Sequence, residues 1–276
     1  MLKALAIAAM LGVSSGAGAG ELTLSEAVPG HPQTSVLDLM RQVIADLTID
    51  ADGQGHGTAM APLRYLGDDV DADPPADIAI SGAELVTLRV DGRPFKLLYS
   101  ALGRSDAVAE VVLLALYDDK LRLLDAVDVG VYENNWFGEV FAIGAGNDGA
   151  RLDSEHFNSS QGYDAAQLVF VRDGKLALID AVYFFSVKGA GYEELQSLTV
   201  TTQPDGAGYW PITATIHATR AVEPADPADA ESSTPPAAPP YDRLITQTYT
   251  WSASIGGYVA DGDAFDRLNA ENEAKY

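Results

Sequence analysis

Between residues 83 and 260 the chain alternates apolar and polar side chains over many short runs. The runs AELVTLRV at 83–90 and SLTVTT at 197–202 are examples, and this period of two is typical of half-buried β-strands. Asp-Gly pairs, which favour tight hairpin turns, stand between such runs at 91–92, 148–149 and 205–206. The pattern therefore predicts an all-β fold made of antiparallel hairpins.

The chain also repeats part of its sequence. LLALYDDKLRLLDAV at 113–127 and LVFVRDGKLALIDAV at 168–182 are identical at 8 of 15 positions, with an offset of 168 − 113 = 55 residues. The Asp-Gly pairs recur at a similar interval, because 148 − 91 and 205 − 148 are both 57. We infer three four-stranded antiparallel repeats of about 57 residues, at 83–130, 139–188 and 197–260. Such repeats pack as a propeller-like or a sandwich-like array, and closed propellers usually need at least four blades.

Residues 223–240 interrupt the third repeat. They contain six of the chain's fourteen prolines and few apolar side chains. A segment of this composition cannot bury enough apolar surface to order itself, so we expect a flexible, disordered insertion at a loop.

Two helices are expected to flank the repeats. In the lead-in segment 20–82, Ser35 is a good N-cap residue, and Asp38 suits the positive first turn of a helix. At the other end, Asp263 can cap a helix within 261–276. The apolar residues that follow Ser35 at helical spacing are Val36, Leu39, Met40, Val43, Ile44 and Leu47.

The first nineteen residues have the pattern of a secretory signal peptide. Lys3 precedes the short apolar run ALAIAAMLGV, and Ala17-Gly18-Ala19 offers a cleavage site after Ala19. No later run approaches the ~20 apolar residues that a membrane-spanning helix needs. We therefore expect an exported protein without a membrane span, located in the periplasm or outside the cell.

Charge and cysteine content narrow the possible functions. Forty acidic and 17 basic residues give a net charge of −23, so the phosphates of nucleic acids should be repelled. The chain has no cysteine, so its stability must come from its apolar core rather than from disulfides.

GAGNDG at 144–149 matches a dinucleotide-binding pattern, but a strand rather than a helix is expected after it. We expect no cofactor.

One stretch, DADGQG at 50–55, has part of a calcium-binding loop. Asp50 and Asp52 stand at the first and third positions of an EF-hand motif. The twelfth position, where a bidentate glutamate is needed, is Ala61. Asp50 and Asp52 are therefore either candidate metal ligands or part of a solvated turn.

The sequence DSEHFNSSQGY at 153–163 is more polar than a packing strand requires. It forms either a ligand-contacting loop or a polar hairpin held by Asn and Ser turns. His156 is the candidate general base. Glu155 is a candidate partner, although strand alternation places it on the other face. The candidate ligand contacts in this stretch are Asn158, Ser159, Gln161 and Tyr163.

Two aromatic residues, Trp136 and Phe137, precede that stretch within YENNWFGE. They either stack on a sugar or a peptide or fill the joint between neighbouring sheets. The leading hypothesis is a noncatalytic binding or interaction module whose partner is a protein, a peptide or a glycan. The alternative is a hydrolase of the cell envelope that uses His156 with a carboxylate brought near it by the fold.

Overall fold

The structure is a computed structural model, and it describes residues 20–67, 70–105, 110–189, 192–222 and 239–274. The expected signal peptide and residues 223–238 of the expected insertion lie outside the described residues.

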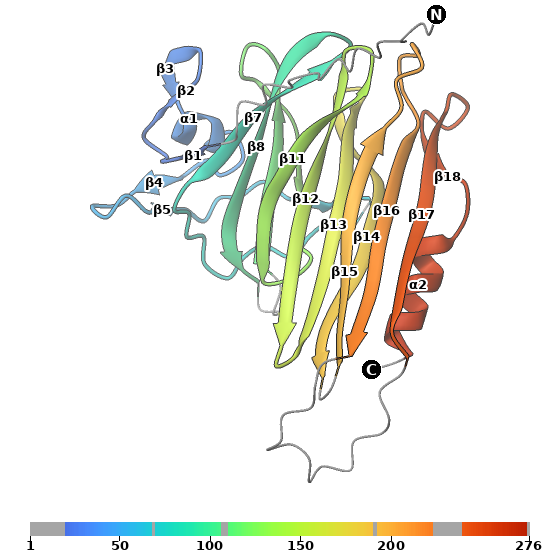
Figure 1. Cartoon of the computed structure of the whole chain (residues 1–276). Helices are drawn as coiled ribbons and strands as arrows, with labels where there is room; N and C mark the ends of the chain where they lie inside the picture. Colours follow the sequence, from blue (N-terminus) through green and yellow to red (C-terminus); the bar gives the residue numbers. More distant parts are fainter. Residues whose placement is uncertain (1–19, 68–69, 106–109, 190–191, 223–238, 275–276) are drawn as a thin grey trace, which may run out of the picture.

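Antiparallel strands dominate the described chain, which confirms the all-β prediction (Figure 1). The first sheet has six strands, in the order β1 (Glu21–Leu22), β7 (Ala83–Val90), β8 (Arg93–Arg104), β9 (Glu110–Tyr117), β10 (Leu123–Asp128) and β6 (Arg64–Tyr65). All of its ladders are antiparallel except the short one between β10 and β6.

The second sheet is an eight-stranded meander in which every strand pairs with its neighbours in sequence. Its order is β11 (Asn134–Gly144), β12 (Asn147–Asn158), β13 (Gln161–Arg172), β14 (Lys175–Gly189), β15 (Tyr192–Thr202), β16 (Ile212–Val222), β17 (Tyr241–Ser252) and β18 (Gly257–Ala260). Two small hairpins lie between β1 and β6 in the chain, β2 (Ala27–Val28) with β3 (His31–Ser35) and β4 (Thr48–Ile49) with β5 (Gly55–His56). The helices are α1 (Val36–Met40) and α2 (Ala264–Glu273).

Three hydrophobic cores are stacked through the molecule. The first lies between α1 with its flanking segments and one face of the six-stranded sheet. The second lies between the other face of that sheet and strands β11 to β14. The third lies between β11 to β14 on one side and β15 to β18 with α2 on the other. Because β13 is covered on both faces, the consecutive residues Val169 and Phe170 are both buried, in the second and third cores respectively.

The N-terminal helix is shorter than expected. α1 ends at Met40, and turns carry the chain onward, yet all six apolar residues predicted for its buried face are buried. The predicted N-cap is present, because Ser35 Oγ accepts from Asp38 N and Asp38 Oδ2 accepts from Ser35 N. At α2, Asp263 occupies the N-cap position but makes no side-chain capping hydrogen bond, and its carboxylate pairs with Arg267 instead.

One predicted turn was wrong. Asp148-Gly149 lies inside β12, and the β11–β12 turn is at Ala145-Gly146, where Gly146 has φ of 84°. Asp148 is buried and accepts three hydrogen bonds from Arg89, through its backbone N, Nε and Nη2, at 2.7 to 3.0 Å. This Asp-Gly pair therefore forms no turn. Its aspartate instead connects the second sheet to Arg89 of the first.

The two similar segments both form hairpins, β9–β10 and β13–β14, but with different registers. Tyr117 pairs with Leu123, whereas the corresponding Arg172 pairs with Lys175. The two hairpins share one irregularity of register: Leu124 and Ile179, which occupy the same position in the two segments, are each skipped by the ladder as at a β-bulge. Neither sheet is closed within the described residues, so the propeller-like form is not confirmed. No helix in the same ranges is long and apolar enough to cross a membrane.

Candidate functional site

The polar stretch 153–163 forms the end of the β12–β13 hairpin. Ser159 and Ser160 make the turn, where Ser159 has φ of 55°, and Asn158 beside them is exposed. Gln161 begins β13, and its Oε1 accepts a hydrogen bond from the Tyr163 hydroxyl at 3.0 Å. Asn158 and Ser159 therefore lie at an exposed tip, whereas Tyr163 is half-buried.

His156 lies beside a carboxylate, but this carboxylate is not Glu155. Its Nδ1 is 2.9 Å from Oε1 of Glu133, in the segment that leads into β11, and the imidazole is 36% exposed. Glu155 is directly opposite Asp164 across the β12–β13 ladder, on the other face of the sheet from His156. Strand alternation thus predicted correctly that Glu155 and His156 point apart.

A row of rings extends from His156 across the sheet. The imidazole centroid is 6.2 Å from that of Tyr132 and 5.9 Å from that of Tyr163. Tyr163 in turn meets Phe185 of β14 edge to face at 5.1 Å. This row connects the predicted polar hairpin to an adjacent cavity.

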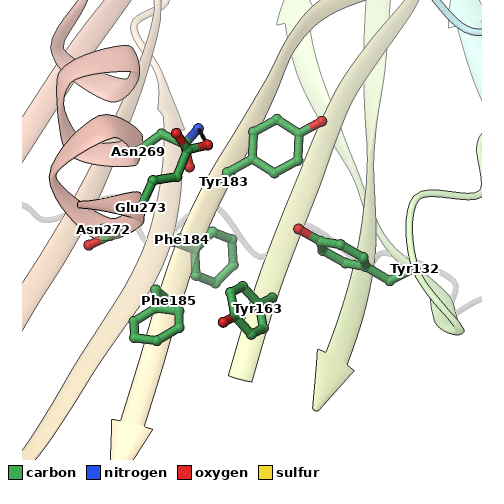
Figure 2. Close-up of a pocket in the computed structure, with 8 residues that line it drawn as sticks. All are labelled: Tyr132, Tyr163, Tyr183, Phe184, Phe185, Asn269, Asn272 and Glu273. Carbon is green, nitrogen blue, oxygen red and sulfur yellow. Dashed lines mark hydrogen bonds between the residues drawn. The ribbon is translucent and has the colours of Figure 1, made fainter. Parts of the chain in front are cut away.

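The cavity, which we call the aromatic pocket, has a volume of about 420 Å³. Five aromatic side chains and three polar side chains from the last turns of α2 line it (Figure 2). Its lining residues are Tyr132, Tyr163, Tyr183, Phe184, Phe185, Asn269, Asn272 and Glu273. Of these, only Tyr163 was a candidate from the sequence.

The pocket lies where β14 and β15 diverge. Their ladder covers only residues 186–189 of β14 with 192–195 of β15, and α2 packs against β14 beside this opening. Gln196 bridges it, because its Oε1 accepts from Phe185 N at 3.1 Å and its side chain pairs reciprocally with the Asn272 amide at 2.9 and 3.1 Å. This amide pair fixes the last turn of α2 against the aromatic strand.

One carboxylate of the sheet, Asp164 of β13, acts on the pocket although it does not line it. Burial raises the pKa of Asp164 from its ordinary value of 3.8 to about 6, with smaller contributions from the carboxylates of Glu155 and Asp153. Burial also raises the pKa of the Tyr132 hydroxyl to about 12, with added contributions from Tyr183 and Asp164. Asp164 therefore acts electrostatically on a ring of the aromatic pocket.

Replacing Asp164 with asparagine should raise the melting temperature near neutral pH. Because the folded-state pKa is above the unfolded value, ionisation of Asp164 destabilises the native state progressively as pH rises from about 4 to about 6. The variant loses this penalty, so its advantage should be largest above pH 6 and vanish near pH 4. Thermal unfolding across this pH range measures the difference. The exposed Asp119→Asn change is the control, and a less stable Asp164 variant at neutral pH would contradict the expectation.

The two aromatic residues predicted beside this site point to opposite faces of β11. Phe137 is buried in the second core and meets Tyr99 edge to face at 6.1 Å. Trp136 is 42% exposed and lies opposite Asp153, on the other face of the sheet from His156. Trp136 and His156 therefore cannot contact one small ligand from the same face.

Asp50 acts as a turn residue in the structure. Its Oδ1 accepts from Asp52 N and Gln54 N at 2.9 and 3.0 Å, and its Oδ2 is 3.1 Å from His56 Nε2. These bonds hold the β4–β5 hairpin. Among the described residues, no group of three or more His, Asp or Glu side chains is arranged to hold a metal ion.

Most of the aromatic pocket was missed from the sequence. Tyr183, Phe184 and Phe185 are consecutive, and three aromatic residues in a row break the alternation expected of a half-buried strand. That break was the available signal. The contribution of α2 had no local signal, because Asn272 and Gln196 are 76 positions apart.

Comparison with known proteins adds no assignment. No protein-family model, no curated protein and no solved structure matches this chain.

Proposed function

We propose that this chain is an exported, noncatalytic binding protein that holds a small ligand in the aromatic pocket. The observation that carries the proposal is the pocket itself: a concave site of about 420 Å³ with five aromatic rings and a few convergent polar groups. Volume and lining of this kind are typical of small-molecule sites. Export is supported by the signal-peptide pattern of residues 1–19.

The pocket is built on firm supports, which a binding site requires. Phe185 is 3% exposed, and Asn272 is 6% exposed and hydrogen-bonded to Gln196. Tyr183 is 37% exposed and gives the pocket an accessible ring. A ligand would thus contact firmly held side chains together with an accessible aromatic ring.

We also propose that the three four-stranded units arose by duplication and form the layers of the molecule. The skipped residues Leu124 and Ile179 stand at the same place in the two similar segments, and each is followed by an aspartate. Asp125 accepts from Arg64 and from Leu176 N, and Asp180 accepts from Ala181 N and Gln247. In both copies the aspartate after the bulge ties its strand to a distant part of the chain.

A second candidate function is hydrolysis. The 2.9 Å contact between His156 and Glu133 resembles the histidine–carboxylate pair that orients a general base, and the His156 ring lies near Tyr132 and Tyr163, which line the pocket. In this case His156 would activate water against a bound ligand. No contact of His156 with a serine or threonine hydroxyl accompanies the pair in the described chain.

Ligand-observed NMR on the purified protein, with a library of glycans, short peptides and small amines, tests the binding proposal. Binders are expected, and Tyr183→Ala should weaken them at least about tenfold, because it removes one wall of the pocket. Trp136→Ala is the control, since Trp136 is equally exposed but lies elsewhere. Loss of binding in Trp136→Ala with none in Tyr183→Ala would place the site outside the pocket. Conversion of a bound ligand that stops in His156→Ala would favour hydrolysis.

A further inference from the structure

The five rings of the aromatic pocket present a common electrostatic property. The face of an aromatic ring is electronegative, and it attracts a cation that lies within about 6 Å of the ring centre. Tyr163 and Phe185 meet edge to face, and Tyr183, Phe184 and Tyr132 complete the lining around them (Figure 2). Several rings around one cavity form the arrangement that suits an alkylammonium group.

Several hydrogen-bond donors of the pocket lining already have partners. The Asn269 amide donates to Glu273 Oε1 at 3.1 Å, and the Asn272 amide donates to Gln196. The Tyr163 hydroxyl donates to Gln161. The polar groups that the lining still offers a ligand are the Glu273 carboxylate, the Asn269 carbonyl oxygen and the hydroxyls of Tyr132 and Tyr183.

The direction of α2 adds to this negative potential. Asn269, Asn272 and Glu273 belong to its C-terminal turns, where unpaired carbonyl groups form the negative end of the helix dipole. The last turn of α2 has no basic residue to offset it. A cation at this end is therefore favoured by both the backbone and the glutamate.

The charge of the surroundings has the same sign. Among the described residues that line the pocket, none is lysine, arginine or histidine. His156, which contacts two rings of the lining, is paired with the carboxylate of Glu133. The whole chain has a net charge of −23, which attracts cations from solution.

We propose that the aromatic pocket binds a small organic cation, an alkylammonium compound of about the size of choline. This inference rests on the proposed binding function and specifies its ligand class. An anion is a poorer match because the described lining offers it no positive charge.

Choline and its neutral isostere 3,3-dimethylbutan-1-ol provide the test. They have the same shape, but choline has a positively charged nitrogen where the isostere has a carbon atom. Calorimetric titration of the purified protein should show that choline binds at least about tenfold more tightly than the isostere, because cation–π attraction acts on choline alone. Added salt should weaken choline binding and leave the isostere unaffected.

Matched variants separate the ring from its hydroxyl. Tyr183→Leu should weaken choline binding several-fold, whereas Tyr183→Phe should retain most of it, because phenylalanine keeps the π face. Glu273→Gln should also weaken choline, and leave the isostere unchanged. These variants change exposed or half-buried side chains, so the fold should be maintained, which circular dichroism can verify.

The outcomes distinguish the two proposals. Equal binding of choline and the isostere would overturn the cation inference and keep the pocket as a binding site. The cation inference would also be overturned if neither choline nor the isostere bound while a neutral ligand from the library bound in a Tyr183-dependent manner. If choline, the isostere and the whole library fail to bind in a Tyr183-dependent manner, both the ligand class and the proposed function are wrong.

Discussion

Replacing Phe170 with alanine is expected to lower the free energy of unfolding by about 3–5 kcal/mol. Phe170 is 1% exposed and meets three rings edge to face, those of Tyr209, Trp251 and Tyr258, at 5.7 to 6.3 Å. Truncation removes these contacts and leaves a cavity in the third core that the stacked pair Tyr209–Trp251 cannot fill without moving. Because a typical domain has only about 5–15 kcal/mol of stability, the loss should be large.

Denaturant unfolding followed by tryptophan fluorescence measures this loss, since Trp251 reports from the same cluster. Phe157→Ala is the matched control, because Phe157 is 56% exposed at the end of β12 and should change stability by less than about 0.5 kcal/mol. A Phe170→Ala protein as stable as the control would mean that β13 and β17 do not enclose a common core.

Arg220→Met should cost a similar amount, about 3–5 kcal/mol, for a different reason. Glu194 is fully buried, and its Oε2 accepts from Arg220 Nη2 at 2.6 Å and from Nε at 3.2 Å. Arg220 also lies over the ring of Tyr241 at 4.9 Å. Removing the arginine would take away both of these hydrogen bonds and the positive charge beside the buried carboxylate.

A double variant tests whether the charge, rather than the packing, accounts for the loss. Arg220→Met with Glu194→Leu removes both charges, and much of the lost stability should return, as is common when a buried ion pair is replaced by apolar side chains. Arg243→Met is the control: Arg243 also lies over Tyr241, but its partner Glu271 is 51% exposed, so the cost should be about 0–1 kcal/mol. A double variant less stable than Arg220→Met would contradict this explanation.

Hairpins were predictable because period-two burial and turn residues are local properties. The predicted run 83–90 coincides with β7, and the predicted run 197–202 lies within β15. The turn predicted at Asp148-Gly149 was wrong because the turn propensity of aspartate is outweighed by its hydrogen bonds to Arg89 in the other sheet. The helix after Ser35 was overestimated because apolar residues at helical spacing can also be buried from successive turns.

The site was predictable only in part, for the same physical reason. The excess of polar residues at 153–163 marked His156 and Tyr163, and both lie in or beside the row of rings that leads into the pocket. Glu133, the partner of His156, lies 23 positions earlier in the chain, and no local rule connects them. The pocket depends on the divergence of β14 from β15 and on the contact of α2 with β14, which no local sequence pattern indicates.

The attachment of α2 has a consequence for local unfolding. Phe265 and Leu268 anchor this helix in the third core, and the Asn272–Gln196 pair holds its far end, so it can detach without breaking any strand ladder. Segments held by few buried contacts open more readily than the whole protein unfolds, and amide hydrogen exchange detects such openings. The amide hydrogens of α2 should therefore exchange before those of the strands that it covers. A ligand bound against the last turn of α2 would slow that exchange.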